Sequence, residues 1–196
     1  MDRAAPRPLL TSLPNVLTYG RILAVPMVAA CFLLFKTDTG RWIAFAIFAA
    51  ACLTDWLDGY LARALDQHSA LGRMLDPIAD KLLVGTALLL LVYDNTIDSV
   101  TIWAAIIILC REILVSGLRE FLAELNVKIL VTQLTKWKTT LQMIALGVLI
   151  AGPAGEKQVA GVLSLGTALL WVAALLTLWT GYDYLKAAIH HAIEHD

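Results

Sequence analysis

Four aspartates stand at close, regular spacing in one of the most apolar stretches of the chain. Asp55 and Asp58 lie in the segment DWLDGYLAR, and Asp76 and Asp80 follow in the segment GRMLDPIAD. If both segments are helical, each pair shares one helix face, because residues three or four apart on a helix are neighbours. A turn near residues 66–69 would bring the two pairs to a similar depth. The spacing therefore predicts a cluster of four carboxylates.

Carboxylates held together in an apolar setting need a compensating cation, because desolvation and mutual repulsion would otherwise protonate most of them. No Cys or His belongs to the predicted cluster, and all-oxygen ligation favours Mg²⁺, Mn²⁺ or Ca²⁺ over Zn²⁺. A bound Mg²⁺ usually keeps positions open for water and for substrate phosphates. The four aspartates therefore indicate phosphate chemistry at a divalent metal.

Two glycines and an arginine extend this interpretation. Gly59 follows Asp58 directly and Gly72 precedes Asp76 by one helical turn, so a bulky ligand can approach the backbone at both points. Arg63 lies one turn beyond Gly59 and can offer a planar pair of donors to a phosphate. Metal and arginine together predict a site for a pyrophosphate.

The rest of the chain has the composition of an all-α integral membrane protein. Its 196 residues are 59% hydrophobic and 16% charged, with a mean hydropathy of +0.74, which excludes an ordinary soluble domain. Six apolar segments are each about long enough to cross a bilayer. They cover residues 14–35, 42–64, 70–93, 99–123, 132–150 and 157–185, with turns expected at 94–98 and 152–155.

We expect one six-helix domain over residues 14–190, followed by a tail at 191–196. Residues 1–13 are open to two interpretations, a short amphipathic helix on the membrane surface or a tail without fixed structure. All Lys and Arg residues except Lys36, Arg41 and Lys157 map to one side of the predicted bundle. The positive-inside rule then places both termini and the aspartates on the cytoplasmic side. A bacterial cytoplasmic membrane is favoured, and no nucleic-acid partner is expected.

The aspartate motif resembles, position for position, the signature of the CDP-alcohol phosphotransferase family. Eight fixed positions fall within a 26-residue window. The resemblance implies a transferase that moves the phosphatidyl group of a CDP-linked lipid to an alcohol and releases CMP. It implies two Mg²⁺ or Mn²⁺ ions on Asp55, Asp58, Asp76 and Asp80. It also implies that Asp80 accepts the proton of the acceptor hydroxyl.

The resemblance further assigns a binding site for CDP-diacylglycerol. Its residues are Asn15, Thr18, Gly59, Arg63, Ser69 and Gly72. Asn15, Thr18 and Arg21 share one face of the first segment, at successive spacings of three. Other interpretations stay open there, since Asn15 can be a helix cap and Arg21 can be an interfacial anchor.

Basic residues in the fourth and fifth segments form a second candidate site. They are Arg111, Arg119, Lys136 and Lys138. Charged residues within a spanning segment are costly and mark function by default. The alternative is that Arg111 pairs with Glu112 or Glu120 as a purely structural link.

Outside the aspartate motif, the chain looks like bacterial members of the family that use sn-glycerol 3-phosphate as the acceptor. This resemblance implies the product phosphatidylglycerophosphate, a role in phosphatidylglycerol and cardiolipin synthesis, and a homodimer. Glycerol 3-phosphate is a dianion, which the four basic residues would bind. Two alternatives remain: another acceptor, as in cardiolipin or inositol-phosphate lipid synthases, or a divalent-cation transporter.

Overall fold

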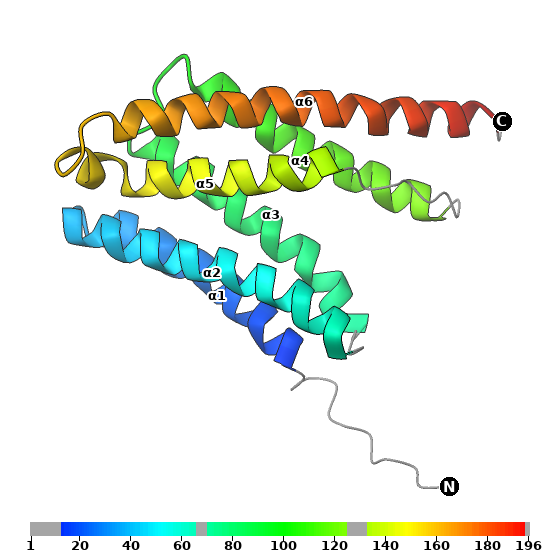
Figure 1. Ribbon diagram of the computed structural model, residues 1–196, viewed down its shortest axis with the longest axis horizontal. Coiled ribbons are helices and arrows are strands. Elements are labelled where there is room, and N and C mark those ends of the chain that lie inside the picture. Colours follow the sequence, from blue (N-terminus) through cyan, green and yellow to red (C-terminus); the bar gives the residue numbers. More distant parts are fainter. Residues whose placement is uncertain (1–12, 66–69, 125–132, 195–196) are drawn as a thin grey trace, which may run out of the picture. The chain divides into compact units, whose positions relative to one another are not determined.

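The computed structural model describes residues 13–65, 70–124 and 133–194. This part of the chain contains six α-helices and no strand, which confirms the all-α prediction (Figure 1). The helices are α1 (Leu13–Leu34), α2 (Asp38–Leu65), α3 (Ala70–Tyr93), α4 (Ile102–Glu124), α5 (Gln133–Glu156) and α6 (Val162–Glu194). Residues 1–12, for which a surface helix and a tail without fixed structure were both open, lie outside the described residues.

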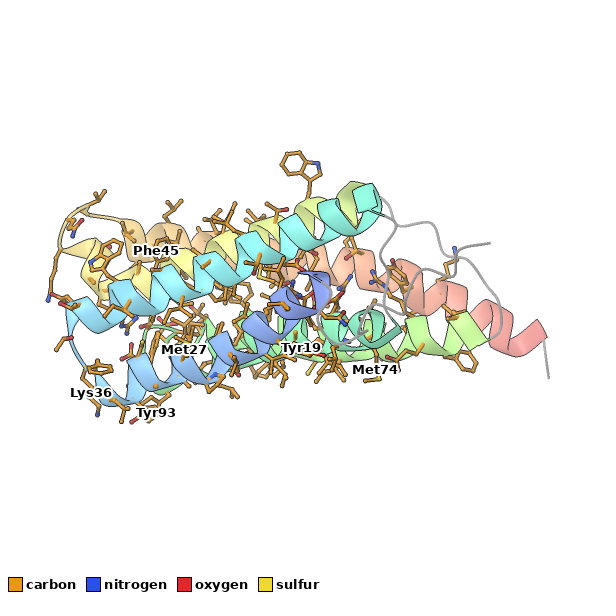
Figure 2. The ribbon with its side chains drawn as sticks, turned by 90° about the horizontal axis from the view of Figure 1, so that it is seen from below. Tyr19, Met27, Lys36, Phe45, Met74 and Tyr93 are labelled. Carbon is orange, nitrogen blue, oxygen red and sulfur yellow. The ribbon has the colours of Figure 1, made fainter. Side chains whose placement is uncertain are left out.

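The chain divides into two compact units, of which the first is Met1–Leu90. In this unit α1 packs side by side with α2 (Figure 1). Lys36 lies at the turn between the two helices, whereas Tyr19 lies toward the other end of α1 (Figure 2). The hydroxyl of Thr37 accepts the backbone N–H of Gly40 at 3.1 Å. This cap explains why α2 begins at Asp38, before the expected start at residue 42.

The second unit is Leu91–Asp196, in which α4 and α5 both pack against α6. Its core contains aliphatic side chains such as Ile108, Leu149 and Leu170, which are fully buried. A Cβ atom at Gly166 of α6 would lie 2.8 Å from the Leu149 side chain of α5. The glycine therefore allows these two helices to approach closely.

Within the turn expected at 152–155 the structure has a break in α5 at Gly152, but helix follows the break, which was not expected. Gly152 has φ 7° and ψ −95°, and Pro153 follows, which cannot donate to the helical ladder. The helix resumes and ends at Glu156. The Glu156 carboxylate accepts the N–H groups of Gly161 and Leu163, each at 2.8 Å, and thereby caps α6. The hydrogen bond from Gly161 is the main reason why the pKa of Glu156 lies below its usual range.

Two stretches in the described part are long and apolar enough to cross a membrane, Asn15–Leu34 and Val162–Lys186. Helices α2, α3 and α4 carry charged residues within their apolar runs, and the charged residues of α5 lie near its two ends. Six membrane spans therefore remain a prediction, as does the single domain over 14–190. Helix α6 itself continues to Glu194, into the range expected to be a tail.

Candidate active site

One face of α1 is polar and completely buried. Asn15, Thr18 and Arg21 follow one another at spacings of three, and each residue is 1% exposed. Because residues three apart on a helix are neighbours, the three side chains form one continuous strip. Acidic side chains of the first unit contact this strip.

Three of the four predicted aspartates reach this strip. The guanidinium of Arg21 contacts Oδ1 of Asp55 through Nη2 and Oδ1 of Asp80 through Nη1, each at 2.9 Å. The hydroxyl of Thr18 donates a hydrogen bond to Oδ1 of Asp76 at 2.5 Å. Residues from α1, α2 and α3 are thereby joined in one polar network.

The cation of this network is buried, whereas its anions are partly open. The Arg21 side chain is 1% exposed, but those of Asp55 and Asp80 are 43% and 41% exposed. Arg21 therefore compensates the negative charge of two carboxylates from the buried side. Another ligand can approach the same carboxylates from the exposed side. Sequence reasoning gave Arg21 no contact with the aspartates. Its spacing from Thr18 shows only that the two residues share a face.

Several predicted site residues fall outside what the structure describes. Asp58, Gly59 and Arg63 lie on α2, but their side chains are outside the described part, and Ser69 lies outside it entirely. Gly72 is buried on α3, one turn before Asp76. Among the described residues, no three His, Cys, Asp or Glu side chains are grouped closely enough to hold a metal ion. The four-carboxylate metal site therefore stays a prediction.

The second unit contains a cluster of buried cations. Arg111 is 6% exposed and Lys138 is 2% exposed. The carboxylate of Glu112 accepts a hydrogen bond from Arg111 Nη1 at 3.3 Å and also pairs with the Lys138 ammonium. The pairing of Arg111 with Glu112, one of the two interpretations from sequence, is therefore present. The side chain of Lys136 lies outside the described part.

Helix α6 supplies the remaining partners of this cluster. Arg111 donates to the carbonyl of Thr177 at 3.2 Å and to the hydroxyl of Thr180 at 3.0 Å. Arg119 donates to the hydroxyl of Tyr184 at 3.0 Å. No role was predicted for these α6 residues from sequence. Their signal is the spacing of 177, 180 and 184, which places polar groups on one face of an otherwise apolar helix.

A cavity of about 620 Å³ lies elsewhere in the second unit. Its lining comes from the segment between α3 and α4, from the break in α5 and from the start of α6. It includes Asp94, Asp98, Ser164 and Trp171. The described lining contains acidic and neutral polar groups but no Lys or Arg. It is therefore poorly suited to a phosphorylated substrate.

Comparison with known proteins agrees with the aspartate motif. The sequence profile of the CDP-alcohol phosphatidyltransferase family matches residues 11–179. A CDP-diacylglycerol–glycerol-3-phosphate 3-phosphatidyltransferase of Rickettsia bellii is 44% identical over 90% of this chain and 94% of its own length. One of the same name from Cereibacter sphaeroides is 40% identical over 91% and 96%. A cardiolipin synthase (CMP-forming) of Oryza sativa is 41% identical over 92% of this chain and 58% of its own. The chain therefore belongs to the CDP-alcohol phosphatidyltransferase family, as its aspartate motif predicted.

Proposed function

We propose that this protein transfers the phosphatidyl group of CDP-diacylglycerol to a hydroxyl of sn-glycerol 3-phosphate. The reaction releases CMP and forms phosphatidylglycerophosphate. Family membership and the names of bacterial relatives that match nine-tenths of the chain support this function. The structural observation that carries it is the approach of Asp55, Asp76 and Asp80 to the buried strip on α1.

The proposed cofactors are two Mg²⁺ or Mn²⁺ ions on Asp55, Asp58, Asp76 and Asp80. Carboxylate oxygens are ligands that these ions prefer. Thr18 and Arg21 contact Oδ1 of the three described carboxylates, and the Asp55 and Asp80 side chains are 43% and 41% exposed, so another ligand can approach these two. The donor set therefore fits the ions. Bound there, they would neutralise charge on the pyrophosphate of the substrate.

The chemical step needs a base and a leaving group. Asp80 accepts the proton of the acceptor hydroxyl on its second carboxylate oxygen. The hydroxyl oxygen then bonds to the phosphorus of the phosphatidyl group, and the bond from that phosphorus to the bridging oxygen of CMP breaks. The electron pair of this bond leaves with CMP. The contact between Arg21 and Oδ1 supports the role of Asp80, because it fixes a carboxylate whose side chain is 41% exposed and can therefore meet an incoming hydroxyl.

The nucleotide end of CDP-diacylglycerol is assigned to residues of the aspartate motif and to the buried face of α1. The proposed contacts are Asn15, Thr18, Gly59, Arg63, Ser69 and Gly72. Buried polar side chains need hydrogen-bond partners, so they are costly in an apolar helix. The burial of Asn15 and Thr18 in α1 therefore supports a role for them in binding. The absence of a side chain at Gly72, which is buried, supports a close approach of ligand to α3.

The acceptor phosphate is assigned to Arg111, Arg119, Lys136 and Lys138. Among the described residues of this cluster, Glu112 is the anion that pairs with Arg111 and Lys138. Arg111 and Lys138, which are both buried, therefore carry more positive charge than Glu112 compensates, and Arg119 is exposed on the same helix as Arg111. A buried surplus of positive charge is costly unless an anion is bound. A phosphate monoester, which is a dianion at neutral pH, matches this surplus better than a neutral alcohol does.

We also propose that all six helices cross the bacterial cytoplasmic membrane, with both termini and the active site facing the cytoplasm. The lengths and apolar character of α1 and α6 support spans at both ends of the chain. The distribution of Lys and Arg supports the orientation. We further propose that the protein acts as a homodimer, on the basis of family resemblance.

The experiment is an acceptor screen on the purified protein in detergent. CMP release from CDP-diacylglycerol is measured with Mg²⁺ and glycerol 3-phosphate, glycerol, serine, inositol 1-phosphate or phosphatidylglycerol, with and without chelator. We expect release that depends on glycerol 3-phosphate and is abolished by chelator. Release with a different acceptor would keep the transferase class and overturn the assignment of the cation cluster. No release from folded protein that still binds metal would favour a cation transporter.

A second candidate acceptor is phosphatidylglycerol, because one relative that matches most of the chain is named a cardiolipin synthase. Its phosphate is a diester with a single negative charge, so it would leave the cation cluster less well compensated. The same screen separates the two acceptors.

A further inference from the structure

One face of α6 is built around the arginines of α4. The face consists of Thr177, Thr180, Gly181 and Tyr184, which stand at the spacing expected for one side of a helix. All four are buried, whereas Trp179 and Tyr182 on other faces of the same helix are 71% and 66% exposed. We call this set the α6 cradle.

Arg111 lies across the first part of the cradle. Its Nε donates to the carbonyl of Thr177 at 3.2 Å and its Nη2 donates to the hydroxyl of Thr180 at 3.0 Å. A Cβ atom at Gly181 would lie 3.2 Å from Cγ of Arg111, so the glycine leaves room for the arginine stem. The guanidinium is thus held in direction by α6 as well as by the adjacent Glu112.

The Thr180 hydroxyl has a fixed polarity. It can donate to the carbonyl of Leu176 at 3.0 Å or of Thr177 at 3.3 Å. Its proton therefore points back along the helix, and a lone pair remains for the N–H of Arg111. A threonine at this position acts as an acceptor toward the cation and as a donor toward its own helix.

Arg119 meets the far end of the cradle. Its Nη2 donates to the hydroxyl of Tyr184 at 3.0 Å, and the guanidinium carbon lies 4.9 Å from the centre of the Tyr184 ring. The ring and the hydroxyl together restrict a long side chain that is otherwise exposed on α4.

All the groups that the cradle offers are neutral. A carbonyl, two hydroxyls and an aromatic ring orient the arginines, but none of them cancels positive charge as an Asp or Glu would. A guanidinium also carries more N–H groups than these bonds use. We propose that the α6 cradle is a positioning surface that holds Arg111 and Arg119 ready for the phosphate monoester of the acceptor. This inference rests on the proposed acceptor site.

The test compares matched substitutions on this face. Thr180→Val and Tyr184→Phe each remove one hydroxyl that accepts from an arginine while keeping the shape of the side chain. Thr177→Val is the control, because within the described part of the chain the Thr177 hydroxyl is buried without a hydrogen-bond partner, and the substitution keeps the backbone carbonyl that Arg111 contacts. Thr180→Ser restores the hydroxyl and serves as the rescue variant.

We expect Thr180→Val and Tyr184→Phe each to raise KM for glycerol 3-phosphate about tenfold, as loss of a hydrogen bond to a charged group predicts. KM for CDP-diacylglycerol and kcat should stay within about twofold of the wild-type values, because the substitutions change only the contacts to the acceptor site. Thr177→Val and Thr180→Ser should behave as wild type. An unchanged KM for glycerol 3-phosphate, or an equal rise for both substrates, would overturn the proposal and leave a merely structural role.

A binding measurement separates this inference from the proposed function. Glycerol 3-phosphate is titrated calorimetrically into wild-type protein and Thr180→Val without CDP-diacylglycerol. If wild type binds it but releases no CMP, the proposed reaction fails, and weaker binding by Thr180→Val still supports the cradle. If wild type releases CMP and both proteins bind equally, the cradle fails and the reaction stands. Absence of any binding overturns the cradle.

Discussion

Among the described acidic residues of the second unit, Glu112 should contribute most to stability. Its carboxylate, 22% exposed, pairs with the ammonium of Lys138, whose side chain is 2% exposed, and with Arg111. Glu112→Gln would leave a buried ammonium without its counter-charge. Removing one partner of a buried pair costs about 3–5 kcal/mol. Because Glu112 is partly exposed, we expect about 2–3 kcal/mol, which for a chain of this size lowers Tm by about 4–12 °C.

The assay is thermal unfolding in detergent, followed by tryptophan fluorescence. Glu120→Gln is the matched control, because Glu120 lies on the same helix but is exposed, and its substitution should change stability by less than about 0.5 kcal/mol. The double variant Glu112→Gln/Lys138→Met removes both charges of the pair. It should be more stable than the sum of the single effects predicts, with a coupling of about 1–3 kcal/mol.

Two results would refute this reasoning. One is a Glu112→Gln protein that unfolds at the same temperature as the Glu120→Gln control. The other is additivity of the two single substitutions to within about 0.5 kcal/mol, since residues that form an ion pair should be coupled. Either result would mean that the Lys138 ammonium gains its stability from something other than Glu112.

Three further predictions concern other described residues. Asp80→Asn should reduce CMP release by about 10²–10⁴-fold without unfolding the protein; near-normal turnover with metal still bound would remove Asp80 as the base. Arg21→Lys keeps the charge but loses the planar guanidinium that bridges two partly exposed carboxylates. The free energy of unfolding should fall by about 1–2 kcal/mol in a thermal unfolding experiment. An unchanged Tm would contradict this expectation. Asp98 accepts the N–H of Thr101 at 3.0 Å. This hydrogen bond is the main reason why the pKa of Asp98 lies below its usual range. The stability that this hydrogen bond adds to the folded state is fully present above the unfolded pKa of about 3.9. It is lost as the pH falls through the lower pKa of the folded state. The Tm difference between wild type and Asp98→Ala should therefore shrink in acid, and a constant difference would count against the cap.

The helices could be predicted because each is a long apolar run. The range 70–93 matches α3 at both ends. The errors lie where local hydrogen bonds decide the boundary. Thr37 caps α2, which begins at Asp38, four residues before the expected start. The residues after Gly152 continue as helix although glycine and proline usually mark a turn.

The candidate site was predictable only along each helix. Spacing shows that Asn15, Thr18 and Arg21 share a face, because that property depends on one helix alone. It cannot show that Arg21 meets Asp55 and Asp80, since the choice of partner depends on how the helices rotate against one another. The same limit applies to the contact between Arg111 and the α6 cradle.

The bridge made by Arg21 also sets an order of events during synthesis. Arg21 emerges from the ribosome 59 residues before Asp80, which at about 5–20 residues per second is an interval of about 3–12 s. During that time the first helix carries the Arg21 cation into or beside the bilayer, while its partner Asp80 has not yet been synthesised. An arginine near the centre of a bilayer costs about 2.5–3.5 kcal/mol. The apolar remainder of α1 must offset this cost alone. A nascent chain halted before its third helix should therefore be an incompletely paired form, exposed to membrane proteases until α3 arrives.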